Sequence, residues 1–179
     1  AFVITFVGLE SIANMYGFKP GEFVLITLLT SMFLHGGIDH IFGNMWYLFM
    51  FGDNVEDKLG KVKYIIFYML AGLAATLTHY ITNIGSNIPA IGASGAISGV
   101  LGAYIVFFPH AKVHTIGMFY QRFTIPAYVM LGLWFLMQFL GVFAGAGGIA
   151  FFAHIGGFVF GAIVAWIYMQ LTQTKKGKK

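Results

Sequence analysis

The sequence predicts an all-α, polytopic membrane protein, a single bundle of six transmembrane helices of which the first is truncated. The chain is 59% hydrophobic and only 9% charged, whereas soluble domains carry about 25% charged residues. Its mean hydropathy is +0.83, and its apolar residues form long runs between short polar segments. A soluble fold cannot bury so large an apolar fraction, so we expect one membrane domain over residues 1–179, with a basic tail over 173–179.

The first apolar run, residues 1–16, is interrupted by Glu10 and Asn14. We expect it to be the remainder of a longer first helix, because a helix that spans a bilayer needs about 20 apolar residues. The next segment, residues 17–37, contains an apolar stretch over 23–34. This stretch is too short to span the bilayer, so it is expected to lie in the membrane interface or to re-enter the bilayer.

Five further apolar runs predict the remaining helices. They cover residues 38–52, 62–81, 94–108, 124–144 and 151–171. The second helix ends at the charged segment that begins with Asp53, the fourth ends before Pro109, and the glycine-rich residues 145–148 separate the last two. Proline and glycine are typical of helix ends and turns, so the positions of these residues favour six separate spans.

The basic residues are distributed asymmetrically along these spans. If the helices alternate in direction, nine of the ten Lys and Arg residues fall on one side, and only Lys19 falls on the other. The nine are Lys58, Lys61, Lys63, Lys112, Arg122, Lys175, Lys176, Lys178 and Lys179. Positive charge accumulates on the cytosolic side of membrane proteins. We therefore expect a cytosolic C-terminus, inward-running second, fourth and sixth helices, and a location in the plasma membrane of a prokaryote.

Composition also limits the partners of the chain. The formal net charge is +4, but four of the basic residues lie in the C-terminal tail, so the charge does not indicate nucleic-acid binding. The chain has no cysteine, which excludes disulfides and thiol chemistry. The expected surroundings are the lipid bilayer, and no cofactor is expected.

Two polar residues, Ser94 and His154, stand in apolar and glycine-rich surroundings, GASG at 92–95 and AHIGG at 153–157. An ionisable residue inside a membrane is costly to bury and therefore indicates a functional site. Both residues lie at the predicted outer end of helices that run parallel and can lie side by side. A serine with a histidine to remove its proton is the minimum equipment for nucleophilic hydrolysis.

A third, acidic member of such a site is hard to find. All six acidic residues precede residue 58, so no carboxylate neighbours Ser94 or His154 in the sequence. Three of the six fall on the predicted cytosolic side. Asp39 is on the outer side but adjoins His40 at the surface, and it is a weak alternative. The sequence therefore favours a Ser-His dyad over a triad.

Donors for an oxyanion are available on the second helix. His40 and Asn44 are four residues apart, so they share one helix face. The Asn44 amide, a neutral His40 and the backbone N–H of Ser94 can each donate a hydrogen bond to a developing oxyanion. Two alternatives stay open for this pair, interhelical hydrogen bonds that only hold the bundle together and a metal site with His35. The five-residue spacing of the two histidines fits a shared helix face poorly, so no metal is expected.

Small residues recur after both candidate residues. The rows are Gly95, Gly99 and Gly102 after Ser94, and Gly157 and Gly161 after His154. Such spacings allow helices to approach closely in lipid. Plain packing explains either row alone, but packing one row against the other would also bring Ser94 toward His154.

Four other polar residues are weaker candidates. Ser98, one turn after Ser94, is more often a packed small residue than a second nucleophile. His79 near the outer end of the third helix has no evident partner in the sequence. His110 and His114 fall in a predicted cytosolic loop, away from the other candidates.

Three motifs together resemble the rhomboid intramembrane serine proteases. They are HGGIDHIFGN at 35–44, GASG at 92–95, and AHIGG at 153–157 followed by Gly161. They fall in order on the second, fourth and sixth predicted helices, and the resemblance covers essentially the whole chain. It implies a six-helix core that cleaves single-span transmembrane proteins near the outer membrane face.

The resemblance also implies residue roles. Ser94 would be the nucleophile and His154 the general base. The oxyanion would be bound by His40, Asn44 and the Ser94 backbone N–H. His35 would be structural or would organise water. The glycines expected to be structural near the site are Gly92, Gly95, Gly157 and Gly161.

Two features depart from the family pattern. Many rhomboids carry a Trp-Arg pair in the loop after the first helix, which this chain lacks, and some carry a tyrosine one turn after the serine, where this chain has Ser98.

The main alternative function is that of a catalytically inactive rhomboid-like protein that binds membrane clients, although such members typically lack the serine or the histidine. A transporter that relays protons through histidines is a further alternative, but no polar path continues to the cytosolic side. The oligomeric state is not indicated.

Overall fold

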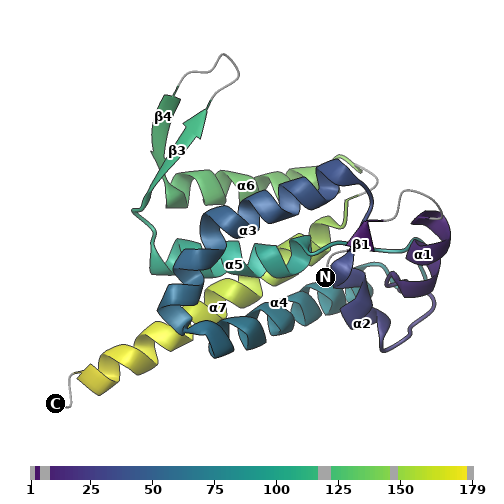
Figure 1. The fold of residues 1–179 in the computed structure, drawn as a ribbon, viewed down its shortest axis with the longest axis horizontal. Helices are drawn as coiled ribbons and strands as arrows, with labels where there is room; N and C mark the ends of the chain where they lie inside the picture. Colours follow the sequence, from purple (N-terminus) through teal and green to yellow (C-terminus); the bar gives the residue numbers. More distant parts are fainter. Residues whose placement is uncertain (1–2, 5–8, 117–121, 146–148, 177–179) are drawn as a thin grey trace.

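The computed structural model of the chain describes residues 3–4, 9–116, 122–145 and 149–176, and these residues are mostly helical (Figure 1). The main bundle consists of α3 (Ile38–Leu59), α4 (Lys61–Thr82), α5 (Ser94–Phe107) and α7 (Phe151–Lys176). α5 packs most extensively against α7, and α4 contacts both helices. Residues 95–104 of α5 are all buried, so α5 is the central helix of the bundle.

Glycines allow the close contact between α5 and α7. A Cβ atom added to Gly102 would overlap the Phe158 carbonyl, and one added to Gly161 would overlap the carbonyl of Gly99. A Cβ on Gly157 would likewise overlap the carbonyl of Gly95. The two glycine rows therefore lie against each other, backbone to backbone, with no room for side chains between them.

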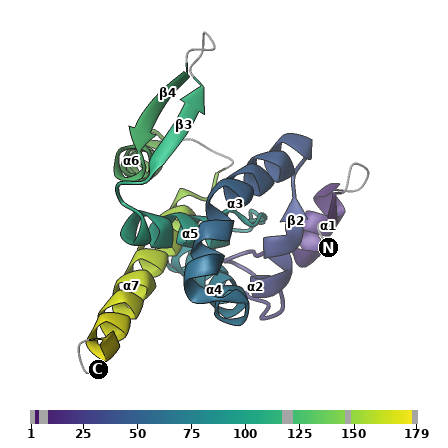
Figure 2. The ribbon, with the colours of Figure 1, turned by 60° about the vertical axis from the view of Figure 1, so that its left-hand side comes forward.

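Helix α6 (Ala127–Phe143) lies along one side of the bundle and packs chiefly against α7 (Figure 2). It is preceded by an antiparallel hairpin of β3 (Lys112–Ile116) and β4 (Arg122–Pro126), which projects from the bundle. The prediction of a helix from residue 124 is wrong over residues 124–126, which belong to β4. Thr124 and Ile125 are β-branched and favour a strand, and Pro126 stands directly before the first helical residue.

The N-terminal region forms short elements beside the bundle. They are β1 (Val3–Ile4), α1 (Leu9–Tyr16), α2 (Thr27–Thr30), a 3-10 turn (Ser31–Phe33) and β2 (Leu34–His35). β1 and β2 pair in parallel, so the predicted helix over 1–16 is wrong at residues 3–4, where two β-branched residues favour an extended backbone. The rest of that prediction before Leu9 lies outside the described residues.

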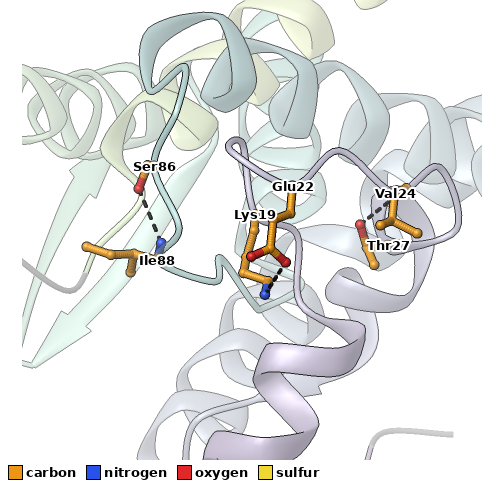
Figure 3. A network of polar contacts seen from close by, with 6 residues as sticks. All are labelled: Lys19, Glu22, Val24, Thr27, Ser86 and Ile88. Atoms are coloured by element: carbon orange, nitrogen blue, oxygen red, sulfur yellow. Dashed lines mark hydrogen bonds and ion pairs between the residues drawn. The ribbon is translucent and has the colours of Figure 1, made fainter.

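The segment before α2 is tied to the loop between α4 and α5. Phe18 and Ala90 exchange backbone hydrogen bonds of 3.0 and 2.8 Å, and Gly21 N–H donates to the Ser86 carbonyl. Figure 3 shows local contacts within these parts of the chain: the Lys19–Glu22 ion pair (2.6 Å), the Thr27 hydroxyl with the Val24 carbonyl (2.7 Å), and the Ile88 N–H with the Ser86 hydroxyl (3.3 Å). The backbone hydrogen bonds of Phe18 and Gly21 hold the loop that leads directly into α5.

Two helices are longer than predicted. α3 continues through residues 53–58, four of which are charged, and ends at Leu59. Gly60 caps this end with a φ of +83°, a region that favours glycine. α7 continues past residue 171 to Lys176. Glu and Lys are good helix formers, so a segment that contains them can end the apolar run without ending the helix.

The membrane spans are identified only in part. Among the described residues, Lys61–Thr82 and Phe151–Gln173 are long and apolar enough to cross a membrane, and Ser94–Phe107 and Ala127–Phe143 are shorter apolar helices. The prediction of a mostly helical protein is confirmed, with two small two-stranded sheets that the all-α prediction omitted.

Candidate active site

Ser94 is the first residue of α5, directly after a tight turn. Gly92 in this turn has a φ of +126°, a region that favours glycine. A Cβ atom on Gly92 would also lie 2.7 Å from Nε2 of His40. Glycine is therefore required here both by the backbone and by the imidazole ring that packs against it.

His154 lies in the first turn of α7, next to Ser94. Its Nε2 is 2.8 Å from Ser94 Oγ, although the two residues are 60 positions apart. This is the distance of a good hydrogen bond. The contact follows from the close packing of α5 and α7, because Gly157, one turn beyond His154, rests on the carbonyl of Gly95.

A third residue, Gln138 of α6, completes the contacts of the histidine. Its Oε1 is 2.9 Å from His154 Nδ1, and its Nε2 donates to the Trp134 carbonyl at 3.0 Å. The sequence-based reasoning missed Gln138. The sequence does contain a signal for it, because Gln138 is the one side-chain amide in the apolar helix α6. Ser94 was a candidate for the same reason, as a polar residue in apolar surroundings.

The pattern with a tyrosine one turn after the serine does not apply to the surroundings of the His154 imidazole ring. Ser98 is fully buried, and its hydroxyl donates to the Ser94 carbonyl at 2.6 Å. The aromatic neighbour of His154 is instead Trp134, with ring centroids 6.0 Å apart and planes inclined by 36°. Trp134 and Gln138, one turn apart on α6, thus both contact the histidine.

His40 and Asn44 of α3 face Ser94 across a cavity of about 370 Å³. The cavity is lined by Asp39, His40, Gly43, Asn44, Tyr47, Ile91, Ser94, Ile97, Ser98, Leu101, Trp134, Ile149, Ala150 and His154. His40 Nδ1 accepts a hydrogen bond from the Gly36 N–H at 3.2 Å, so in the neutral ring Nε2 carries the proton. Asn44 is buried, and its Nδ2 has no hydrogen-bond partner among the described residues. Two donors therefore line the space in front of the serine.

His35 lies behind His40 rather than in the cavity. It is fully buried in β2, and its ring meets the His40 ring edge to face at 5.1 Å. Burial lowers the pKa of His35, and the neighbouring His40 lowers it further. His35 thus packs against the ring of His40. Within the described residues, no group of three or more His, Asp or Glu side chains is arranged to hold a metal ion.

The remaining histidines contact residues other than Ser94 and His154. His79 of α4 has a partner that the sequence did not reveal, the Asn83 amide 3.2 Å from its Nδ1. His114 of β3 pairs across the hairpin with the Thr124 hydroxyl at 3.1 Å. His110 contacts the ring of Tyr128.

The sequence matches known proteins over most of its length. A sequence model of the rhomboid domain matches residues 22–171. The presenilin-associated rhomboid-like protein, mitochondrial, of Bos taurus is 32% identical over 146 residues, 80% of this chain and 38% of that protein. Rhomboid protein 1, mitochondrial, of Saccharomyces cerevisiae is 29% identical over 164 residues, 86% of this chain and 45% of that protein.

A bacterial relative matches a similar share of the chain. YdcA of Bacillus subtilis, named provisionally as a rhomboid protease, is 28% identical over 143 residues, 80% of this chain and 67% of that protein. The chain spans less than half the length of the two mitochondrial relatives. The family predicted from three short motifs is confirmed by the domain match, and the chain belongs to the rhomboid family of membrane proteins.

Proposed function

We propose that the chain is an intramembrane serine endopeptidase that hydrolyses a peptide bond in or next to the transmembrane segment of membrane proteins. The observation that carries this proposal is the 2.8 Å contact between Ser94 Oγ and His154 Nε2. A hydroxyl within hydrogen-bond reach of a base is the arrangement that activates serine as a nucleophile. Both side chains also line the cavity of about 370 Å³ that His40 and Asn44 line.

In the proposed mechanism His154 accepts the Ser94 proton while Oγ attacks the scissile carbonyl carbon. The tetrahedral intermediate collapses, the C–N bond breaks, and His154 gives the proton to the leaving amine. Water then attacks the acyl-enzyme and loses a proton to His154. The ester bond breaks, the new carboxyl end leaves, and the proton returns to Ser94, so the cycle calls for no cofactor.

The negative charge of the intermediate needs hydrogen-bond donors that are already in place. We propose Asn44 Nδ2, His40 Nε2 and the backbone N–H of Ser94 for this role. The first is a buried donor without a partner among the described residues, and the second carries the ring proton because Nδ1 accepts from Gly36. The third lies at a helix N-terminus, where backbone N–H groups have no partner within the helix.

We further propose six membrane spans, a cytosolic C-terminus and an active site toward the outer face. The asymmetry of the basic residues supports this orientation. The relatives include mitochondrial and bacterial proteins. We therefore propose that the chain is an integral membrane protein of a mitochondrion or of a prokaryotic cell. That residues 1–179 form one membrane domain stays a prediction.

The proposed substrates are single-span membrane proteins. A helix shields its own carbonyl groups by internal hydrogen bonds, so a transmembrane segment must unwind locally to be cut. The expected substrates therefore contain residues that weaken a helix near the cleavage site.

Proteolysis of a panel of single-span substrates by the purified, membrane-reconstituted chain tests the proposal. Ser94→Ala and His154→Ala are each expected to abolish cleavage, because removing either member of a dyad removes the nucleophile or its base. Ser11→Ala and His110→Ala are matched controls at exposed positions away from the site, and they should cleave at the wild-type rate.

A fluorophosphonate probe separates the proposed protease from an inactive client-binding protein. The probe should label Ser94 in the wild type and fail to label Ser94→Ala. A chain that binds the substrates but is neither labelled nor able to cut them would be the client-binding alternative. Cleavage retained in either the serine or the histidine variant would refute the dyad.

A further inference from the structure

We infer that Gln138 is a positioning residue that holds His154 in the tautomer needed to deprotonate Ser94; this inference rests on the proposed function. Gln138 lies on α6, a different helix from either Ser94 or His154, and is 7% exposed. Its Oε1 is 2.9 Å from His154 Nδ1. A buried amide is costly unless its polar atoms are hydrogen-bonded, and here both ends of the amide are engaged.

The second contact of the amide sets the direction of the first. Gln138 Nε2 lies 3.0 Å from the Trp134 carbonyl oxygen, which can only accept a hydrogen bond. The amide nitrogen must therefore point to Trp134, and the amide oxygen must face His154. That oxygen also only accepts, so Nδ1 of His154 carries the proton. The lone pair of the neutral ring is then on Nε2, 2.8 Å from Ser94 Oγ, where a base is needed.

Gln138 thus occupies the position that a carboxylate holds in a Ser-His-Asp triad, but it carries no charge. A carboxylate both orients the histidine and stabilises its protonated form, whereas a neutral amide can only orient it. The titratable groups near the ring from the other helices are Asp39 and His40 of α3, across the cavity, and His79 of α4, which lines the adjoining space behind Ser94. Among the described residues, the side chains that α5 and α6 bring to the ring are uncharged.

Two substitutions of Gln138 distinguish its orienting effect on His154 from the effect of a charge at this position. Gln138→Met keeps the length of the side chain and removes the acceptor, so fluorophosphonate labelling of Ser94 and substrate cleavage should both slow on the order of tenfold, the effect of one lost neutral hydrogen bond. Gln138→Glu keeps an acceptor and should restore the rate at high pH. Its negative charge favours the protonated histidine, so the acidic limb of the pH–rate profile should move to higher pH.

The measurement is the labelling rate of full-length, membrane-reconstituted protein over a range of pH, with thermal unfolding as a check that each variant is folded. Gln173→Met, an exposed position of α7, is the matched control and should behave like the wild type. A Gln138→Met variant that labels at the wild-type rate would overturn the inference. A folded Gln138→Glu variant with an unshifted profile would overturn it as well, even if Gln138→Met fails to fold. Failure of the wild type to label and cleave would instead refute the proposed function.

Discussion

At the scale of single residues, Asn44 presents a buried donor with no partner among the described residues. Leaving a buried donor unsatisfied costs about 1–3 kcal/mol. Such a cost is explained if the partner forms only during the reaction, because catalysis depends on interactions that are made in the transition state and not before it. The oxyanion proposed beside Ser94 is a partner of this kind.

Replacing Asn44 by leucine tests this explanation. Asn44→Leu keeps a similar volume and removes the donor, so the cleavage rate should fall by about 10²–10³, as for other lost oxyanion donors. Thermal stability should stay the same or rise, because the substitution also removes an unsatisfied buried group. A large loss of stability would instead mean that Asn44 holds the bundle together, which was the alternative reading of the His40–Asn44 pair.

At the scale of elements, the Ser94–His154 contact depends on how closely α5 and α7 approach. Gly161→Ala would place a Cβ atom on the Gly99 carbonyl, which is backbone and cannot turn aside. The helices must then separate, at a cost of about 1–3 kcal/mol for overpacking. Both the unfolding temperature in detergent and the labelling rate of Ser94 should therefore decrease.

Gly132 of α6 provides the matched control for this substitution. Nothing lies within 4 Å of a Cβ atom added there, and alanine is a better helix residue than glycine by roughly 0.5–1 kcal/mol. Gly132→Ala should therefore be at least as stable as the wild type. Equal stability of Gly161→Ala and the wild type would contradict the close approach of the two helices.

The elements also show which features the sequence could predict. Apolar runs located the helices, and motifs of a serine and a histidine among glycines located the two residues that meet at 2.8 Å. The prediction that the second helix ends before Asp53 is wrong, because apolarity marks residues suited to a membrane and does not mark every residue of a helix. Gln138 was missed because its partner His154 is 16 residues away on another helix. Only packing reveals such a contact.

At the scale of the whole molecule, three helices begin at the same end of the bundle. His40 lies in the first turn of α3, Ser94 starts α5 and His154 lies in the first turn of α7. Because these residues meet around one cavity, α3, α5 and α7 run in the same direction. This is the arrangement that the six-span prediction requires of its second, fourth and sixth helices. It places the charged C-terminal end of α3 and the lysines at the end of α7 away from the cavity.

The orientation in the membrane can be tested directly because the chain contains no cysteine. Single cysteines can be introduced at four exposed positions, by Lys61→Cys, Asn87→Cys, His110→Cys and Ala144→Cys. Asn87 follows α4 and Ala144 follows α6, so both lie at the cavity end; Lys61 and His110 lie at the opposite end. In intact cells, a membrane-impermeant maleimide should label the cysteines at 87 and 144, and those at 61 and 110 only after permeabilisation. The reverse pattern would contradict the cytosolic C-terminus, and labelling of 87 and 110 from the same side would contradict a span between them. Because the readout is independent of catalysis, this result holds whether or not the Ser94 site is active.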